Sequence, residues 1–108
     1  MSETPKVIKI NGMRWTVALL DRIEMFRKTD EKLFGQCCPS ENEVRIRSDV
    51  PPDRTRSVLW HEIFHAIEMD AGYDFAEEQV RAMSHGLFVV LRDNPQFVEW
   101  LLEEVTNE

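Results

Sequence analysis

The sequence predicts a single α+β domain over residues 1–108, in which a small sheet of about four strands is followed by three helices. Three observations support this fold. Short apolar runs separated by turn residues fill the first half of the chain. Apolar residues at helical spacing fill the second half, and no linker or internal repeat divides the two. The pattern allows an antiparallel or a mixed sheet.

The chain opens with a predicted β-hairpin. Two apolar runs, 7–10 and 15–19, flank the dipeptide Asn11-Gly12. Both residues of this dipeptide tolerate positive φ, so it is a strong signal for a tight turn between antiparallel strands. The mixed charges of residues 20–32 fit either a short helical turn or a long loop.

Two further strands complete the predicted sheet. Residues 33–38 form a short strand, and residues 39–42 form a turn. Residues 43–47 alternate apolar and polar side chains, which is the period of a strand with one buried and one solvated face. A disulfide between the adjacent Cys37 and Cys38 would be strained, so we expect two reduced thiols near a strand end.

Three helices are predicted in the second half. The first spans about 15 residues from an N-cap at Asp53 or Thr55 to a stop at Gly72, and its broad apolar surface makes it central. The second runs from about 75 or 76 to 92. Apolar residues nearly encircle it, which predicts packing on several sides.

The last predicted helix covers residues 96–105, after the Asn94-Pro95 dipeptide that ends the preceding one. Its pattern is amphipathic. We expect Trp100 to cover the core, and the alternative is that it belongs to a surface that binds a partner.

The stretch 61–65, His-Glu-Ile-Phe-His, is an HExxH motif inside the first of these helices. Its two imidazoles stand one turn apart and can hold a single zinc ion, while Glu62 can act as general base toward a water that the metal activates. The motif arises by chance in roughly one shuffled chain in a hundred. The competing interpretation, two satisfied core histidines beside a surface glutamate, is weaker because a buried histidine without a partner is costly.

A catalytic zinc site takes a third protein ligand, for which a carboxylate is expected. Glu77 and Glu78 begin the next helix, where the chain can return beside the motif. On a helical wheel, Glu77 lies closer to the stripe that contains Val80 and Ser84, and Glu78 shares a face with His85. Both faces look buried, so the wheel does not decide between the two.

The groups that would support catalysis are less well defined by the sequence. Asp70 and Asp74 are both candidates for a carboxylate that orients an imidazole. Tyr73 and His85 are both candidates for stabilising an oxyanion, although a loop aromatic and an ordinary helix residue are simpler explanations for them.

The motifs of the C-terminal half resemble those of the small phage and prophage zinc-peptidase-like proteins related to the ImmA/IrrE metallopeptidases. The similarity lies in an LxHExxHA helix at 59–66, an EExV segment at 77–80 and an LRDNP sequence at 91–95. The N-terminal half is similar mainly in the layout of its strands. The resemblance implies a minimal zincin-like fold.

The resemblance also implies a gluzincin-like site. In it, His61 and His65 would bind Zn²⁺, Glu62 would be the catalytic base, and Glu78 rather than Glu77 would be the third metal ligand. The pattern departs from that of the larger glutamate zincins, in which an aspartate commonly lies four residues after the ligand.

The implied function is that of a zinc-dependent metallopeptidase, encoded by a phage or prophage, that hydrolyses a peptide bond in an intracellular protein. The alternative is a catalytically inactive, metal-stabilised module for protein interaction. A structural domain without metal is a weaker possibility. The sequence leaves the substrate and the oligomeric state open.

The composition of the chain argues against some classes of binding partner. A net charge of −7 argues against nucleic-acid binding, and the only basic cluster, formed by four arginines between 45 and 56, fits a solvated face better. No apolar run is long enough to cross a membrane. The first residues lack the features of a secretion signal, so we expect a cytoplasmic protein.

Overall fold

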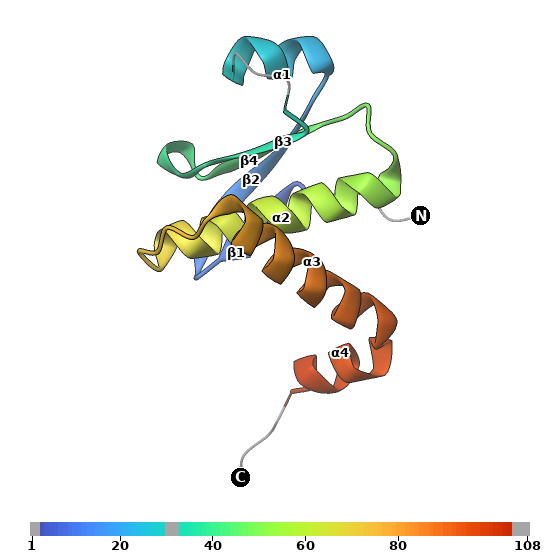
Figure 1. Cartoon of the computed structure of the whole chain (residues 1–108). Helices are drawn as coiled ribbons and strands as arrows, with labels where there is room; N and C mark the ends of the chain where they lie inside the picture. Colours follow the sequence, from blue (N-terminus) through green and yellow to red (C-terminus); the bar gives the residue numbers. More distant parts are fainter. Residues whose placement is uncertain (1–2, 30–32, 105–108) are drawn as a thin grey trace.

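The chain adopts an α+β fold, as predicted, in a computed structural model that describes residues 3–29 and 33–104 (Figure 1). The described residues form four helices rather than the expected three. In chain order, the elements are β1 (Val7–Ile10), β2 (Met13–Leu20), α1 (Arg22–Thr29), β3 (Gly35–Cys38), a 3-10 turn (Pro39–Glu41), β4 (Glu43–Arg47), α2 (Pro52–Asp70), α3 (Glu77–Asp93) and α4 (Pro95–Leu102).

The strands of the described residues form one mixed sheet in the order β1-β2-β4-β3. β1 and β2 are antiparallel and are joined through Asn11 and Gly12, whose φ angles of 50° and 80° confirm the predicted tight turn. β2 and β4 are parallel, whereas β3 pairs with β4 in the antiparallel sense. β3 therefore lies at an edge of the sheet.

The helix α1 is the element that the sequence left undecided. It begins with a reciprocal cap, because Asp21 Oδ1 accepts a hydrogen bond from the Glu24 amide and Glu24 Oε1 accepts one from the Asp21 amide. Met25 anchors the helix and is only 1% exposed. In Figure 1, α1 lies on one side of the sheet and α2 on the other. Residues 30–32 of the undecided segment lie outside the described residues.

The core fills the space between the sheet and α2. Because side chains alternate along a strand, Val44 and Ile46 of β4 point to the same face, and neither is exposed at all. The core cluster consists of Ile10, Trp15, Val17, Val44, Ile46, Leu59 and Ala66. This packing fixes the face of α2 that turns toward the sheet.

The opposite face of β4 is less solvated than the sequence predicted. Arg45 is only 8% exposed, and its guanidinium donates to Glu43, Glu41 and Gln36 at distances of 2.6, 2.9 and 3.0 Å. Neighbouring acceptors thus compensate the buried charge. Arg47 is likewise paired, with Asp49 at 2.7 Å.

The helix α2 begins earlier than predicted. Its N-cap is Pro51, and Pro52 occupies the first helical position, where a proline loses no intrahelical hydrogen bond. Neither Asp53 nor Thr55 is the cap, because both lie inside the first turn, where the Thr55 hydroxyl donates to the Pro51 carbonyl. Gly72, with a φ of 79°, follows the C-terminus as predicted.

The helices α3 and α4 are more exposed than the sequence predicted. Within the described residues, α3 buries only Val80 and Ser84, so the expectation of packing on several sides is wrong. α4 buries none of its residues, and Trp100 is 67% exposed instead of covering the core. Val105, the predicted end of α4, lies outside the described residues. No helix in the described part of the chain combines the length and apolarity needed to cross a bilayer.

Gly35 allows β3 to approach α2 closely. A Cβ atom at this position would lie 2.5 Å from Val58 Cγ1 and 3.3 Å from Glu62 Oε2. Val58 is β-branched and cannot easily move its methyl group away. We therefore expect Gly35→Ala to lower the free energy of unfolding, measured by urea denaturation, by about 1–3 kcal/mol.

Gly86 provides the matched control for this substitution. It lies inside α3, and no atom comes within 4 Å of a Cβ built there. Gly86→Ala should raise the free energy of unfolding by up to about 1 kcal/mol, because alanine favours a helix interior. Equal effects of the two substitutions would contradict a steric role for Gly35.

Candidate metal centre

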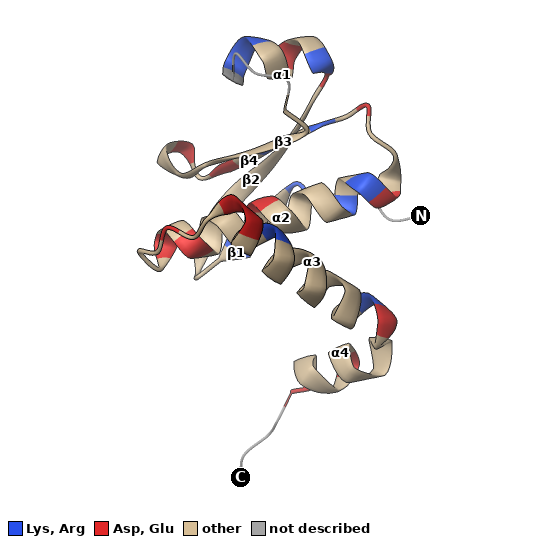
Figure 2. Cartoon of the chain, in the orientation of Figure 1, with Lys and Arg blue, Asp and Glu red and all other residues tan. Residues whose placement is uncertain are grey.

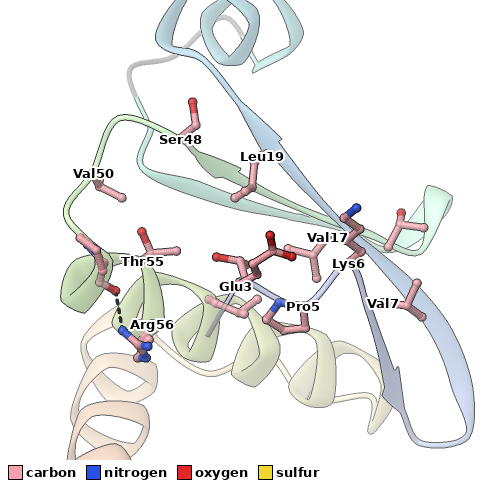
Figure 3. A pocket seen from close by; sticks show the side chains of 14 residues that line it. Glu3, Pro5, Lys6, Val7, Val17, Leu19, Ser48, Val50, Thr55 and Arg56 are labelled. Carbon is pink, nitrogen blue, oxygen red and sulfur yellow. Dashed lines mark hydrogen bonds between the residues drawn. The ribbon is translucent and has the colours of Figure 1, made fainter. Parts of the chain in front are cut away.

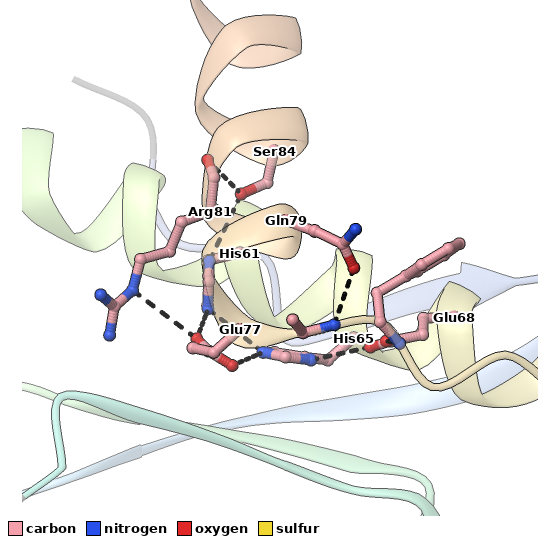
Figure 4. Close-up of polar contacts among 9 residues, drawn as sticks. His61, His65, Glu68, Glu77, Gln79, Arg81 and Ser84 are labelled. Atoms are coloured by element: carbon pink, nitrogen blue, oxygen red, sulfur yellow. Dashed lines mark hydrogen bonds and ion pairs between the residues drawn. The ribbon is translucent and has the colours of Figure 1, made fainter.

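The helices α2 and α3 bring two histidines and one glutamate together (Figure 4). His61 Nε2 and His65 Nε2 are 3.2 Å apart. Glu77 Oε1 lies 2.9 Å from His61 Nε2, and Glu77 Oε2 lies 3.2 Å from His65 Nε2. Three potential ligands from adjacent turns of α2 and from the first turn of α3 thus converge on one point.

These separations fit a metal ion. In a tetrahedral site with bonds of about 2.0–2.1 Å, two ligand atoms are about 3.3 Å apart. The two imidazole nitrogens are 3.2 Å apart, and each lies 2.9 or 3.2 Å from a different oxygen of Glu77, which is close to that value. The two histidines and the carboxylate are also the ligand types of a hydrolytic zinc site.

The far side of each imidazole has an acceptor, which indicates which ring nitrogen carries the proton. His61 Nδ1 lies 3.3 Å from Ser84 Oγ, and this hydroxyl itself donates to the Arg81 carbonyl. His65 Nδ1 lies 3.0 Å from Glu68 Oε1. With a metal ion bound, the protons would lie on Nδ1 and both Nε2 lone pairs would be directed at the ion.

Glu68 is held in place by a second contact. Its other carboxylate oxygen accepts a hydrogen bond from the Phe75 amide in the loop before α3, and the residue is only 7% exposed. The carboxylate that orients an imidazole is therefore Glu68, not Asp70 or Asp74. Asp70 instead accepts a hydrogen bond from the Asn11 side chain. The three-residue spacing of Glu68 from His65 is the sequence signal for this contact.

Glu62 lies on the same helix between the two histidines and opens onto the same cleft. It is 8% exposed, and its carboxyl has no hydrogen-bond partner among the described residues. Burial is the main cause that raises the pKa of Glu62 to about 7, while His65 opposes this rise and the Glu77 carboxylate contributes to it. A carboxyl group with such a pKa can take up and return a proton near neutrality.

The glutamate beside the histidines is Glu77, whereas the family resemblance favoured Glu78. Val80 and Ser84 face α2, and Glu77 shares their side of α3 through its spacing of three and seven residues. Glu78 is turned by about 100° from this side and is exposed. Partial burial opposes the ionisation of Glu77, but its contacts with the two histidines outweigh burial and lower the pKa of this carboxyl.

The cysteines are not placed as metal ligands. Cys37 and Cys38 are free thiols on β3. Burial raises the pKa of Cys37 to about 12, and the nearby Glu62 carboxylate adds to the effect. The pKa of Cys38 is also raised by burial. Both groups are therefore protonated near neutrality, whereas metal binding uses the thiolate.

The cleft that His61, Glu62 and Glu77 help to line has a volume of about 780 Å³. Cationic and aromatic side chains of α2, α3 and the segment before β3 line it: Phe34, Arg54, Trp60, Arg81, His85 and Phe88. Arg81 Nε lies 3.8 Å from Glu77 Oε1, a contact that the sequence reasoning missed although the two residues are four apart on one helix. Tyr73 stacks on Phe75 and does not line this cleft in the described structure.

A second pocket, of about 1050 Å³, lies at the other end of α2, beside the segment before β1 (Figure 3). Among the described residues that line it, Glu3 is the only carboxylate, and none is a histidine or a cysteine. Arg56 there donates to the Pro52 carbonyl. This pocket therefore lacks the convergent ligands of the first cleft.

No protein-family model, no curated protein and no solved structure matches this chain.

Proposed function

We propose that this chain is a zinc-dependent metallopeptidase whose metal is held by His61, His65 and Glu77. The observation that carries the proposal is the convergence of these three ligands beside the cleft that His61, Glu62 and Glu77 help to line. Further support comes from the HExxH motif and from the resemblance to the ImmA/IrrE-related proteins. On the same ground, we propose an intracellular protein or peptide as substrate and a phage or prophage origin.

Zinc is the metal that this ligand set favours. Imidazole and carboxylate ligands in a three-membered, nearly tetrahedral arrangement are typical of catalytic zinc, although other divalent ions accept the same ligands. When bound, the ion would act as a Lewis acid that lowers the pKa of a water and polarises a carbonyl group.

The chain itself would supply the proton transfer. Glu62 would accept a proton from the attacking water and return it to the leaving amine, for which a pKa near neutrality is suitable. Ser84 and Glu68 would hold the two imidazoles in one orientation. Arg81 and His85 are two of the donors that line the cleft, and either could stabilise negative charge on the carbonyl oxygen.

The edge strand β3 would hold the substrate. It lies next to α2, where Gly35 approaches Glu62, and its outer edge can add an extended peptide through main-chain hydrogen bonds. This position would bring the scissile bond close to Glu62.

The test is the hydrolysis of a peptide library, prepared from a digested bacterial proteome, by the zinc-loaded chain. Mass spectrometry should detect new peptide termini that disappear with a chelator and return when zinc is added. A chain that binds zinc but yields no new termini would support the alternative of a metal-stabilised interaction module instead.

The contact between Glu68 and His65 gives a prediction about metal affinity. Glu68→Gln removes the negative charge beside His65 Nδ1 and one of the two acceptor oxygens. We expect the zinc affinity, measured by competition with a chelating dye, to fall about 10- to 100-fold. Asp70→Asn is the control and should leave this affinity unchanged. Equal losses in both variants would contradict the role of Glu68.

A further inference from the structure

The last two helices, α3 and α4, are called the arm here: the first half of α3 packs on α2, and the rest of the arm projects from the molecule (Figure 1). The chain measures 53 × 34 × 26 Å, and its radius of gyration is 15.0 Å. A compact domain of this length has a radius of gyration of about 13 Å. The arm therefore leaves helix surface uncovered that a compact monomer would bury.

The uncovered surface is apolar. Met83, Leu87 and Val90 are spaced by four and three residues, which places them on one side of α3, and each is more than 40% exposed. Exposed apolar side chains continue along α4, with Phe97, Trp100, Leu101 and Leu102. An isolated helix of eight residues is marginal in water, so α4 needs a surface to pack on.

The area of this surface is that of a protein interface. From a full area of about 150–250 Å² for a large side chain, the exposed fractions leave roughly 560–940 Å² of apolar surface on the arm. The largest apolar patch of a typical monomer covers about 300–600 Å². A standard interface buries about 800 Å² per partner.

The charges of the arm argue against an anionic membrane as the occupant of this surface. Glu99, Glu103 and Glu104 lie on or beside α4, and Arg92 at the end of α3 is 3.6 Å from Asp93 (Figure 2). Negative lipids would repel these carboxylates. Most of the ribbon of α3 and α4 in Figure 2 is tan, the colour of residues other than Lys, Arg, Asp and Glu.

We propose that the apolar side of the arm is a dimer interface that binds a second copy of this chain. A pair of helices with one apolar side is self-complementary, so two arms related by a two-fold axis form a four-helix bundle. The stacked rings of Phe97 and Trp100, 6.2 Å apart, provide an aromatic anchor in each copy. Arg81 and His85 lie on another side of α3, so the candidate metal centre stays accessible.

The test is the mass of the full chain in solution by sedimentation equilibrium over a range of concentrations. We expect about 25 kDa, twice the 12.7 kDa of one chain. Leu101→Glu should raise the dimer dissociation constant at least about 30-fold. Leu19→Glu is the matched control, because Leu19 is 49% exposed on β2 and Leu101 is 54% exposed, and it should leave the mass unchanged.

Hydrogen exchange of the unsubstituted chain gives a second measurement, which does not depend on whether a substituted chain folds. The amides of α4 should exchange more slowly as the protein concentration rises. A chain that stays monomeric at all concentrations would overturn the proposal, as would equal behaviour of the two variants. Protection of α4 only in the presence of phosphatidylcholine vesicles would also overturn it and indicate a membrane surface.

Discussion

The Glu62→Gln variant is expected to cleave peptides at least about 100-fold more slowly than the unsubstituted chain while it retains bound zinc. Glutamine keeps the shape of the side chain but cannot take a proton from water. Because Glu62 is not one of the three converging ligands, the metal should stay in place. The measurements are the initial rate of cleavage of one library peptide and the zinc content of the same sample.

The control for this variant is Glu78→Gln, which makes the same chemical change at an exposed position of α3. It should change neither the cleavage rate nor the zinc content. If Glu62→Gln cleaved at the unsubstituted rate, the proton transfer would have to come from another group. If it lost its zinc, Glu62 would be a metal ligand, and the proposed division of roles would be wrong.

Replacement of Glu77 by alanine is expected to lower the zinc affinity at least about 100-fold, because loss of a ligand costs more than loss of a partner that only orients one. Alanine removes both oxygens that approach the imidazoles and favours a helix as strongly as any residue. The dissociation constant can be measured by competition with a chelating dye at fixed pH.

Glu78→Ala tests which of the two neighbouring glutamates is the ligand. It removes an equal charge one residue further along the same helix, so its zinc affinity should equal that of the unsubstituted chain. A loss in Glu78→Ala and not in Glu77→Ala would restore the choice that the family resemblance favoured. Equal losses of zinc affinity in the two variants would indicate that the negative charge at the N-terminus of α3 supports zinc binding, and not one particular glutamate.

Local signals in the sequence predicted much of the fold. The Asn11-Gly12 turn and the stop at Gly72 depend on backbone angles that few residues adopt, and both are confirmed. The helix α1 was missed as a firm prediction although Asp21 and Glu24 form a capping box, because the short segment after them has no clear periodicity. The turn and the helix stop could be predicted because each depends on a steric restriction of the backbone angles.

The geometry of the site was less predictable. Spacing alone placed His61 and His65 on adjacent turns, but the third ligand depends on how α3 is rotated about its axis. The contact of Val80 and Ser84 with α2 sets this rotation, and one residue changes the direction of a side chain by about 100°. The loop between α2 and α3 determines which side of α3 makes the contact, and no pattern in the loop reveals it.

The arm shows a different limit of prediction from sequence. The spacing of apolar residues predicted the helices α3 and α4 correctly. The prediction that the rest of the chain covers their apolar side chains was wrong. Apolar side chains require burial, but the pattern does not distinguish burial within one chain from burial between two.

Zinc K-edge X-ray absorption of the purified, zinc-loaded chain tests the central claim most directly. If His61, His65 and Glu77 hold the metal, the spectrum should show two imidazole nitrogens and carboxylate oxygen at about 2.0–2.2 Å from the zinc ion. A sulfur shell at about 2.3 Å, which would point to Cys37 and Cys38, would contradict it. So would a chain that retains no zinc after dialysis.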